Sequence, residues 1–148
     1  MTLYRERLWA SPWVFLSTAL VIPASLLVFL PINFAAGVVV ALVLYACIVL
    51  ALVATSPVVE VTEGELIAGR ASVPIALIGP VTAYFGEDAT LQRGRKLDAR
   101  AWLMIRGWVS PVVRVELTDV NDSTPYWIVS TRKPHAVVAA IATARSAA

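Results

Sequence analysis

The sequence has a long segment without any charge. No Asp, Glu, Lys, Arg or His occurs between Leu8 and Val59. Charged residues make up 15% of the chain and hydrophobic residues 59%, whereas soluble domains have about 25% and about 45–50%. This composition excludes an ordinary soluble domain along the whole chain. It predicts a membrane protein with a polar appendage that holds nearly all of the charge.

Residues for redox and metal chemistry are scarce. Cys47 is the only cysteine, so it has no partner for an intramolecular disulfide, and no metal-ligand spacing surrounds it. The glycines form neither a P-loop nor a dinucleotide-binding motif. The acidic segment Asp119–Ser123 has Thr124 and Ser130 where a calcium loop of the EF-hand type needs Gly and Glu. We therefore predict a tight turn there, and neither a metal ion nor a cofactor.

The only histidine, His135, is the one side chain that titrates near neutral pH without perturbation. Ser130, Thr131 and Asp122 are close to it in sequence, but catalysis needs a base, a nucleophile and an orienting group in a defined arrangement. No such spacing is present. We predict an exposed histidine in the first turn of a helix, and no catalytic residue.

Two uncharged segments, residues 13–30 and 34–54, are each long enough to cross a bilayer, which needs about 20 helical residues. Between them, Pro31 disfavours helix continuation, and Asn33 is a favourable N-cap for the second helix. Pro23 predicts a kink within the first helix. Together the segments predict an antiparallel transmembrane hairpin.

Basic residues predict the orientation of this hairpin. Arg5 and Arg7 precede the first helix, Arg70 follows the second, and the short loop between the helices has no charge. The positive-inside rule places both termini in the cytoplasm, with a multi-pass protein in the inner membrane. Trp9 and Trp13 are expected to anchor the interface. The predicted parts are a cytoplasmic flank over residues 1–12, the hairpin over 13–57, and a cytoplasmic β domain over 58–148.

The polar part has the pattern of short strands followed by one helix. Apolar residues alternate with polar ones, or β-branched residues cluster, at 59–62, 66–68, 73–75, 81–85, 102–106, 113–118 and 126–130. From Pro134 to Arg145 the spacing becomes helical. We expect about six antiparallel strands in a small curved sheet or partly open barrel, closed by the C-terminal helix. This order resembles the bacterial pleckstrin-homology-like domains that follow membrane helices.

Several segments also resemble one family along essentially the whole chain. They are Tyr4–Leu8 followed by Pro12-Trp13, Val73–Ile75, Leu97–Ala101, and Asp122–Trp127 with Ser130-Thr131-Arg132. The chain is similar to a family of alanine-rich membrane proteins from actinobacteria, catalogued as domain of unknown function 3093. The resemblance implies a two-helix membrane anchor and an actinobacterial source. It implies no activity and no catalytic residue.

Clustered cations are the main candidates for binding. Hydroxyl groups, two cations and the free amides of a helix N-terminus meet at Ser130–Lys133, which suits an anion; either Thr131 or Lys133 is the helix cap. A second basic group lies in a predicted loop that runs into a strand and consists of Arg93, Arg95, Lys96, Arg100 and Arg106. Its charge suits the anionic inner leaflet. It also fits a solvated loop that only obeys the positive-inside rule. The candidates for binding an anion or lipid headgroup are Arg93, Arg95, Lys96, Arg100, Arg132 and Lys133.

These observations favour a non-enzymatic integral membrane protein that presents a small β domain at the inner leaflet as an accessory or scaffold module. The alternative is a pleckstrin-homology-like binder of anionic lipid headgroups or a phosphorylated ligand, and the third hypothesis is an enzyme of unrecognised type. The lipid bilayer is the expected partner. A protein partner, or a homo-oligomer through the small residues Gly37 and Ala41, is also compatible with the pattern. A membrane anchor and the lack of a recognition motif disfavour nucleic acid.

Overall fold

The computed structural model describes residues 1–147. The chain forms two compact units. One contains residues 9–56, and the other contains residues 1–8 together with the chain from Pro57 onward. We describe each unit by itself.

The first unit is a helical hairpin. It contains α1 (Pro12–Thr18), α2 (Val21–Phe29) and α3 (Phe34–Ala54). The bounds of α3 are those predicted, and the Asn33 side-chain oxygen accepts a hydrogen bond from the backbone N–H of Ala36 at 3.1 Å, which confirms the predicted cap.

The predicted first helix is interrupted between α1 and α2, as expected for a segment with an internal proline. Pro23 has no N–H to donate to the carbonyl of Ala19. That carbonyl accepts from the N–H of Ile22 instead, at 3.0 Å, so the helical hydrogen-bond pattern tightens one turn before the proline. The distortion predicted from Pro23 is therefore present.

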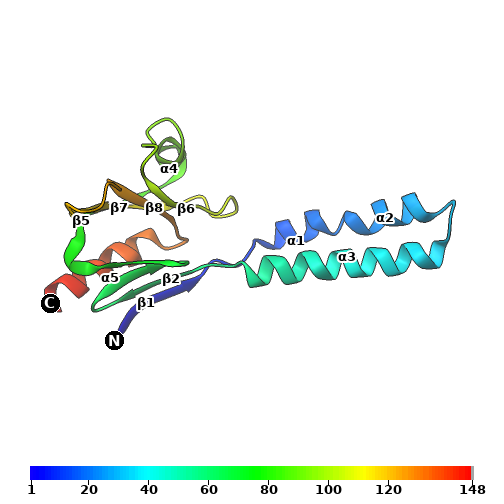
Figure 1. The fold of residues 1–148 in the computed structure, drawn as a ribbon, viewed down its shortest axis with the longest axis horizontal. Helices are drawn as coiled ribbons and strands as arrows, with labels where there is room; N and C mark the ends of the chain where they lie inside the picture. The colour runs from blue at the N-terminus through cyan, green and yellow to red at the C-terminus, as the bar shows by residue number, and fades with distance from the viewer. Residues whose placement is uncertain (148) are drawn as a thin grey trace. The chain divides into compact units, whose positions relative to one another are not determined.

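Within the hairpin, α2 and α3 run side by side in opposite directions (Figure 1). Gly37 and Ala41 are the buried residues of α3. A Cβ atom at position 37 would lie 2.9 Å from the Cβ of Phe29, so glycine is what allows the close approach of the two helices. The predicted small-residue contact joins the two helices of one hairpin.

Little of the hairpin's apolar surface is buried. Only 6% of the window Pro12–Phe29 and 11% of the window in Phe34–Ala54 are buried. A core helix of a soluble protein would be mostly buried, so this alternative does not fit. By length and composition, both helical segments could cross a membrane.

The second unit begins with a four-stranded antiparallel sheet. Its strands, in spatial order, are β1 (Thr2–Arg7), β2 (Val58–Thr62), β3 (Glu65–Ala68) and β4 (Ala71–Pro74). β2 and β3 lie where the alternating pattern predicted strands. β1 was not predicted, because we expected only a flank before the hairpin. Pro74 lies on an edge strand, where its missing N–H costs no internal hydrogen bond.

A second four-stranded sheet follows the short 3-10 helix η1 (Ile75–Leu77). Its spatial order is β5 (Ile78–Tyr84), β7 (Val112–Leu117), β8 (Tyr126–Ser130) and β6 (Trp102–Met104). β7 and β8 form the predicted hairpin. The prediction of an entirely antiparallel set was wrong, because β6 pairs with β8 in parallel. After β6, the chain skips one sheet position to form β7 and then returns to fill that position as β8, between β7 and β6.

Two helices complete the second unit. α4 (Gly86–Arg93) was not predicted, whereas α5 (Pro134–Ala147) is the predicted C-terminal helix. α5 packs against strands of both sheets, and Figure 1 shows it between them. The single curved sheet or partly open barrel is therefore replaced by two sheets that share one helix.

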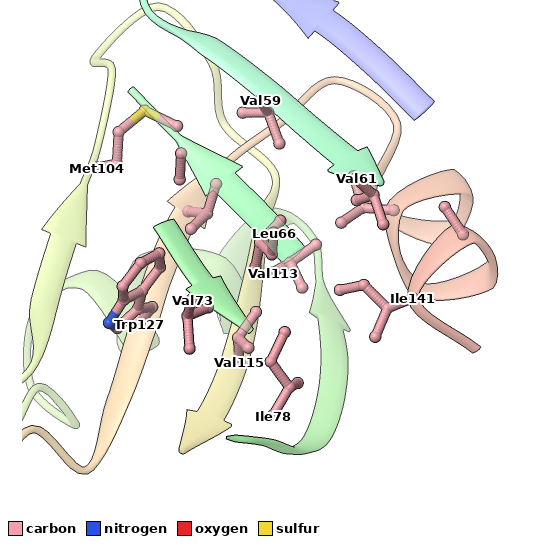
Figure 2. Close-up of a cluster of buried hydrophobic side chains, with 14 of the residues drawn as sticks. Val59, Val61, Leu66, Val73, Ile78, Met104, Val113, Val115, Trp127 and Ile141 are labelled. Atoms are coloured by element: carbon pink, nitrogen blue, oxygen red, sulfur yellow. The ribbon is translucent and has the colours of Figure 1, made fainter. Parts of the chain in front are cut away.

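One core joins the inner faces of the two sheets and α5. Figure 2 shows it with residues from the first sheet, such as Val61 and Leu66, close to Val113 and Val115 of β7 and Ile141 of α5. Because side chains alternate along a strand, Val112 of β7 points to the other face of the second sheet. There it joins a smaller cluster with Ala89 of α4. α4 and α5 therefore cover opposite faces of the second sheet.

Candidate functional site

The predicted anion-binding corner at the start of α5 holds a carboxylate of the chain itself. Glu6 of β1 lies beside Thr131 and Arg132, which follow β8. The Thr131 hydroxyl donates to Glu6 Oε2 at 2.6 Å, and the backbone N–H of Arg132 donates to the two carboxylate oxygens at 3.2 and 3.3 Å. The Tyr4 hydroxyl also donates to Glu6 Oε2, at 2.8 Å. We call these four residues the Glu6 latch.

Strand geometry and the α5 cap position the latch. Tyr4 and Glu6 are two residues apart on β1, so their side chains leave the same face of the strand. Thr131 is fully buried, and its hydroxyl oxygen accepts from the N–H of Lys133 at 3.2 Å. The carbonyl of Lys133 then accepts from the N–H groups of Ala136 and Val137. The Thr131 hydroxyl thus stabilises the turn that precedes α5, and the carbonyl of Lys133 accepts the first hydrogen bonds of the helix.

Charge matching in the latch is partial. Arg132 Nη1 lies 3.8 Å from Glu6 Oε1, and the side chains are 40% and 13% exposed. Because Arg132 is more than a third exposed, solvent screens this ion pair. The short hydrogen bonds from Thr131 and Tyr4 hold the carboxylate more firmly. Arg132, a predicted binding residue, therefore faces an internal anion.

Tyr4 is the latch residue with a strongly shifted pKa. Burial of the phenol raises the pKa of Tyr4 to about 12, the hydrogen bond with Thr131 opposes this rise, and the adjacent Glu6 adds to it. A phenolate next to a carboxylate would place two negative charges in contact. Tyr4 is therefore a neutral hydrogen-bond donor at physiological pH.

The other predicted binding residues lie in a second place, around the loop that follows α4. Arg93 ends α4, and Arg95, Lys96 and Arg100 follow it. The Tyr126 hydroxyl, at the first residue of β8, contacts this loop, whereas Arg132 and Lys133 follow the last residue of β8. The structure therefore separates the six candidates into two groups at opposite ends of one strand. We call residues 93–100 the basic loop.

Tyr126 fixes the backbone of the basic loop. Its hydroxyl donates to the carbonyl of Lys96 at 3.3 Å and accepts from the N–H of Asp98 at 2.7 Å. The tyrosine ring is buried, and the Arg114 guanidinium lies 3.8 Å from the ring centroid, a cation–π contact. The backbone of the loop is thus held by Tyr126, although Arg95, Lys96 and Arg100 are exposed.

Charges within the loop differ in their partners. Asp98 accepts from the backbone and side chain of Arg100, with Arg100 Nη2 at 3.2 Å from Oδ2, and this hydrogen bonding lowers the pKa of Asp98. Arg93 donates through Nε to the carbonyl of Ala89 at 3.3 Å. Arg95 and Lys96 are exposed.

Arg114 and Gln92 were not predicted as notable residues. Arg114 of β7 donates to the Gln92 side-chain oxygen at 3.2 Å and lies 3.5 Å from Glu116. Gln92 belongs to α4 and is buried. A charged residue within the alternating pattern of β7 gave no sign that a helix would cover it.

The predicted position of His135 and the predicted turn in the acidic segment are confirmed. His135 is exposed in the first turn of α5, with its ring 4.9 Å from that of Phe85. Asp119 and Asp122 each accept a backbone N–H two residues ahead, at 2.9 and 2.8 Å, as in a side-chain-stabilised turn. Within residues 1–147, no group of three His, Cys, Asp or Glu side chains is placed to hold a metal ion. The predicted membrane anchors, Trp9 and Trp13, are exposed.

Comparison with known families assigns the chain. The profile of the family described as "Protein of unknown function (DUF3093)" matches residues 3–141. The chain belongs to this DUF3093 family. Comparisons with curated proteins and with solved structures gave no match. The family match extends from β1 into α5, so it includes both sides of the Glu6 latch. It does not test the actinobacterial source or the alanine-rich description, which stay predictions.

Proposed function

We propose that this DUF3093 protein is an integral membrane protein whose helical hairpin crosses the inner membrane twice. The hairpin anchors a small β domain at the cytoplasmic surface. The domain acts there as a non-enzymatic accessory or scaffold module.

Exposed apolar surface supports insertion of the hairpin. Large apolar side chains such as Leu20, Leu27 and Leu50 are 67–72% exposed in the chain by itself. Soluble proteins rarely expose apolar patches larger than a few hundred Å², whereas a helix that is apolar all round suits lipid. Lipid is the environment that would cover both helices along their length.

Pairing of β1 with β2 is the observation that carries the proposed topology. β1 precedes the hairpin and β2 follows it, yet Arg7 pairs with Val58, and the N–H of Leu8 donates to the carbonyl of Pro57 at 2.9 Å. Segments of one sheet must lie on the same side of a membrane. The pairing therefore favours an even number of crossings, with the N-terminal strand and the β domain on one side.

The cytoplasmic side follows from the distribution of basic residues. The chain's Lys and Arg residues all lie outside the uncharged segment between Leu8 and Val59. Positive residues are retained on the cytoplasmic side, so the proposed side is the cytoplasm.

The pleckstrin-homology-like description is also part of the proposal. Two sheets that share a core, with one C-terminal helix packed against both, support it. The parallel β6 and the helix α4 depart from the simple antiparallel pattern on which we based the likeness. The residues of the Glu6 latch hydrogen-bond one another and so offer no site for a ligand. We therefore base the scaffold role on the position of the β domain at the membrane surface.

Carbonate extraction tests the anchor. Membranes from cells expressing the full chain are washed at high pH, which releases peripheral proteins. We expect the chain to stay in the membrane pellet and to dissolve only in detergent. A matched variant with Leu27→Lys and Leu44→Lys, which places one charge in each span, should be released or degraded. Release of the unmodified chain by carbonate would refute the anchor.

Purification in mild detergent tests the scaffold role. Stoichiometric co-purification of one partner through the β domain would support it, provided that Glu6→Lys, which disrupts the latch, lowers recovery of that partner. Repeated recovery of the chain alone after chemical cross-linking in intact cells would count against a scaffold.

A further inference from the structure

We propose that the basic loop binds the phosphate groups of anionic lipid headgroups in the membrane that holds the hairpin. This inference rests on the membrane anchoring proposed above and names the partner of one surface of the β domain. Arg95 and Lys96 are the principal binding residues, and Arg93 is adjacent to them.

Arg95 and Lys96 differ from most other basic residues of the domain in having exposed, unmatched charges. Three cations elsewhere lie beside carboxylates: Arg5 lies 3.7 Å from Glu60, Arg114 lies 3.5 Å from Glu116, and Arg132 lies 3.8 Å from Glu6. Within residues 1–147, neither Arg95 nor Lys96 has a side-chain hydrogen bond or ion pair. Two adjacent unmatched cations form a site for an external anion.

The acidic residues nearby do not cancel this charge. Asp98 is paired with Arg100, whose guanidinium donates two hydrogen bonds to its carboxylate. Glu87 and Asp88 lie in the first turn of α4, at the opposite end of that helix from the loop. The loop therefore keeps a local positive excess at Arg93, Arg95 and Lys96.

A fixed backbone distinguishes this loop from a flexible basic tail. The N–H of Lys96 donates to the carbonyl of Leu91 at 3.0 Å, and the N–H of Leu97 donates to the carbonyl of Gly94 at 3.0 Å. On the other side, the buried Tyr126 hydroxyl holds the carbonyl of Lys96 and the N–H of Asp98. A preorganised loop loses little backbone freedom on binding.

The anchor explains why the occupant is a lipid headgroup. The hairpin leaves and re-enters the β domain at Leu8 and Pro57, so in the proposed topology the domain stays tethered close to the membrane surface. Tethering turns headgroup binding into an intramolecular event with a high effective concentration. Each basic residue near an anionic leaflet then adds roughly fivefold to the association, from the free energy per residue at such surfaces.

The chain's two lysines, Lys96 and Lys133, give an internal control for a test with the full chain. Both are exposed, but only Lys96 belongs to the basic loop. The chain is reconstituted into nanodiscs of zwitterionic lipid, with or without about a third of anionic phospholipid. Acylation of each lysine by an amine-reactive reagent is then followed by mass spectrometry.

We expect anionic lipid to slow the acylation of Lys96 several-fold relative to Lys133, and 0.5 M salt to remove the difference. Arg95→Gln should reduce this protection of Lys96, while Arg70→Gln, the same change at an exposed residue outside the loop, should leave it intact. Equal acylation of Lys96 with and without anionic lipid would overturn the inference, as would equal protection of both lysines.

Two controls distinguish a headgroup from a soluble phosphate ligand, and loss of binding from loss of the anchor. Inorganic phosphate added to zwitterionic nanodiscs should give no protection of Lys96. Protection equal to that from anionic lipid would overturn the assignment to a lipid headgroup and indicate a soluble phosphate ligand. A chain that does not stay with the nanodiscs would refute the anchor and the inference together. A chain that stays without lipid-dependent protection refutes only the inference.

Discussion

Replacement of Glu6 by glutamine tests whether the latch holds β1 to the start of α5. Glutamine keeps the shape of the side chain but replaces one acceptor oxygen with an NH₂ group. The carboxylate accepts from the Tyr4 and Thr131 hydroxyls and from the Arg132 N–H, so the amide would place a donor against at least one of these donors. Hydrogen bonds to charged groups contribute about 1.5–3 kcal/mol, and the screened Arg132 pair adds about 0.5 kcal/mol or less. We expect a loss of about 2 kcal/mol.

Hydrogen–deuterium exchange of the full chain in mild detergent measures this loss locally. The peptides of interest cover β1 and the first turn of α5. Where exchange follows local opening, a loss of about 2 kcal/mol accelerates it roughly 30-fold. The acceleration should occur in both peptides, because the latch joins them, while α3 in the hairpin should exchange as before.

Glu63→Gln is the matched control. Glu63 lies 3.2 Å from the N-terminal amine, and the two groups are 51% and 83% exposed, so this ion pair contributes less than about 0.5 kcal/mol. In Glu63→Gln, exchange in the peptides of β1 and the first turn of α5 should change by less than about threefold. If Glu6→Gln accelerates exchange no more than Glu63→Gln does, the latch does not hold β1 and the reasoning from its geometry is wrong.

Three further predictions concern helix packing, backbone strain and pH. Gly37→Val should push α2 and α3 apart, because even a Cβ there would lie 2.9 Å from a side-chain atom of α2. Distances between spin labels on the two helices should lengthen, and stability in detergent should fall by about 1–3 kcal/mol. Ala46→Val on the exposed face should change neither. Gly86→Ala should lower the free energy of unfolding by about 1 kcal/mol, because Gly86 has φ +51°. Gly64→Ala should be neutral or stabilising, because Gly64 has open space and no positive φ. A similar loss at both sites in denaturant unfolding would contradict the argument. The pKa of Tyr4 is raised to about 12, so the phenol ionises at lower pH in the unfolded chain than in the folded chain. The stability from Tyr4 is therefore fully present below pH 10 and is lost as the pH rises toward 12. The free energy of unfolding should differ less between pH 9 and pH 11 in Tyr4→Phe than in the unmodified chain.

Local patterns predicted much of the fold. The uncharged segment predicted both helices of the hairpin because lipid-crossing helices need length and apolarity. Alternation predicted β7 and its partner β8. α4 was missed although a signal exists: Glu87 and Asp88 in its first turn and Arg93 in its last turn complement a helix dipole.

Contacts between distant segments could not be predicted from the sequence. β1 is a strand because it pairs with β2, which follows the hairpin. Nothing within Thr2–Arg7 indicates this partner. The parallel pairing of β6 depends likewise on the path of the chain between sheet positions. Cations and hydroxyls at Ser130–Lys133 predicted a phosphate or lipid headgroup there. In the structure, Thr131 instead donates to a carboxylate 125 positions earlier in the chain, which only the fold brings there.

Cysteine accessibility in oriented membrane vesicles tests the two-crossing topology most directly. Single cysteines replace Thr2 and Ser146, both exposed, one at a time in a Cys47→Ser background, and a membrane-impermeant maleimide is added to right-side-out or inverted vesicles. The proposed topology predicts that both cysteines react only in inverted vesicles. Reaction of the two cysteines from opposite sides, or of both from the outside, would contradict it.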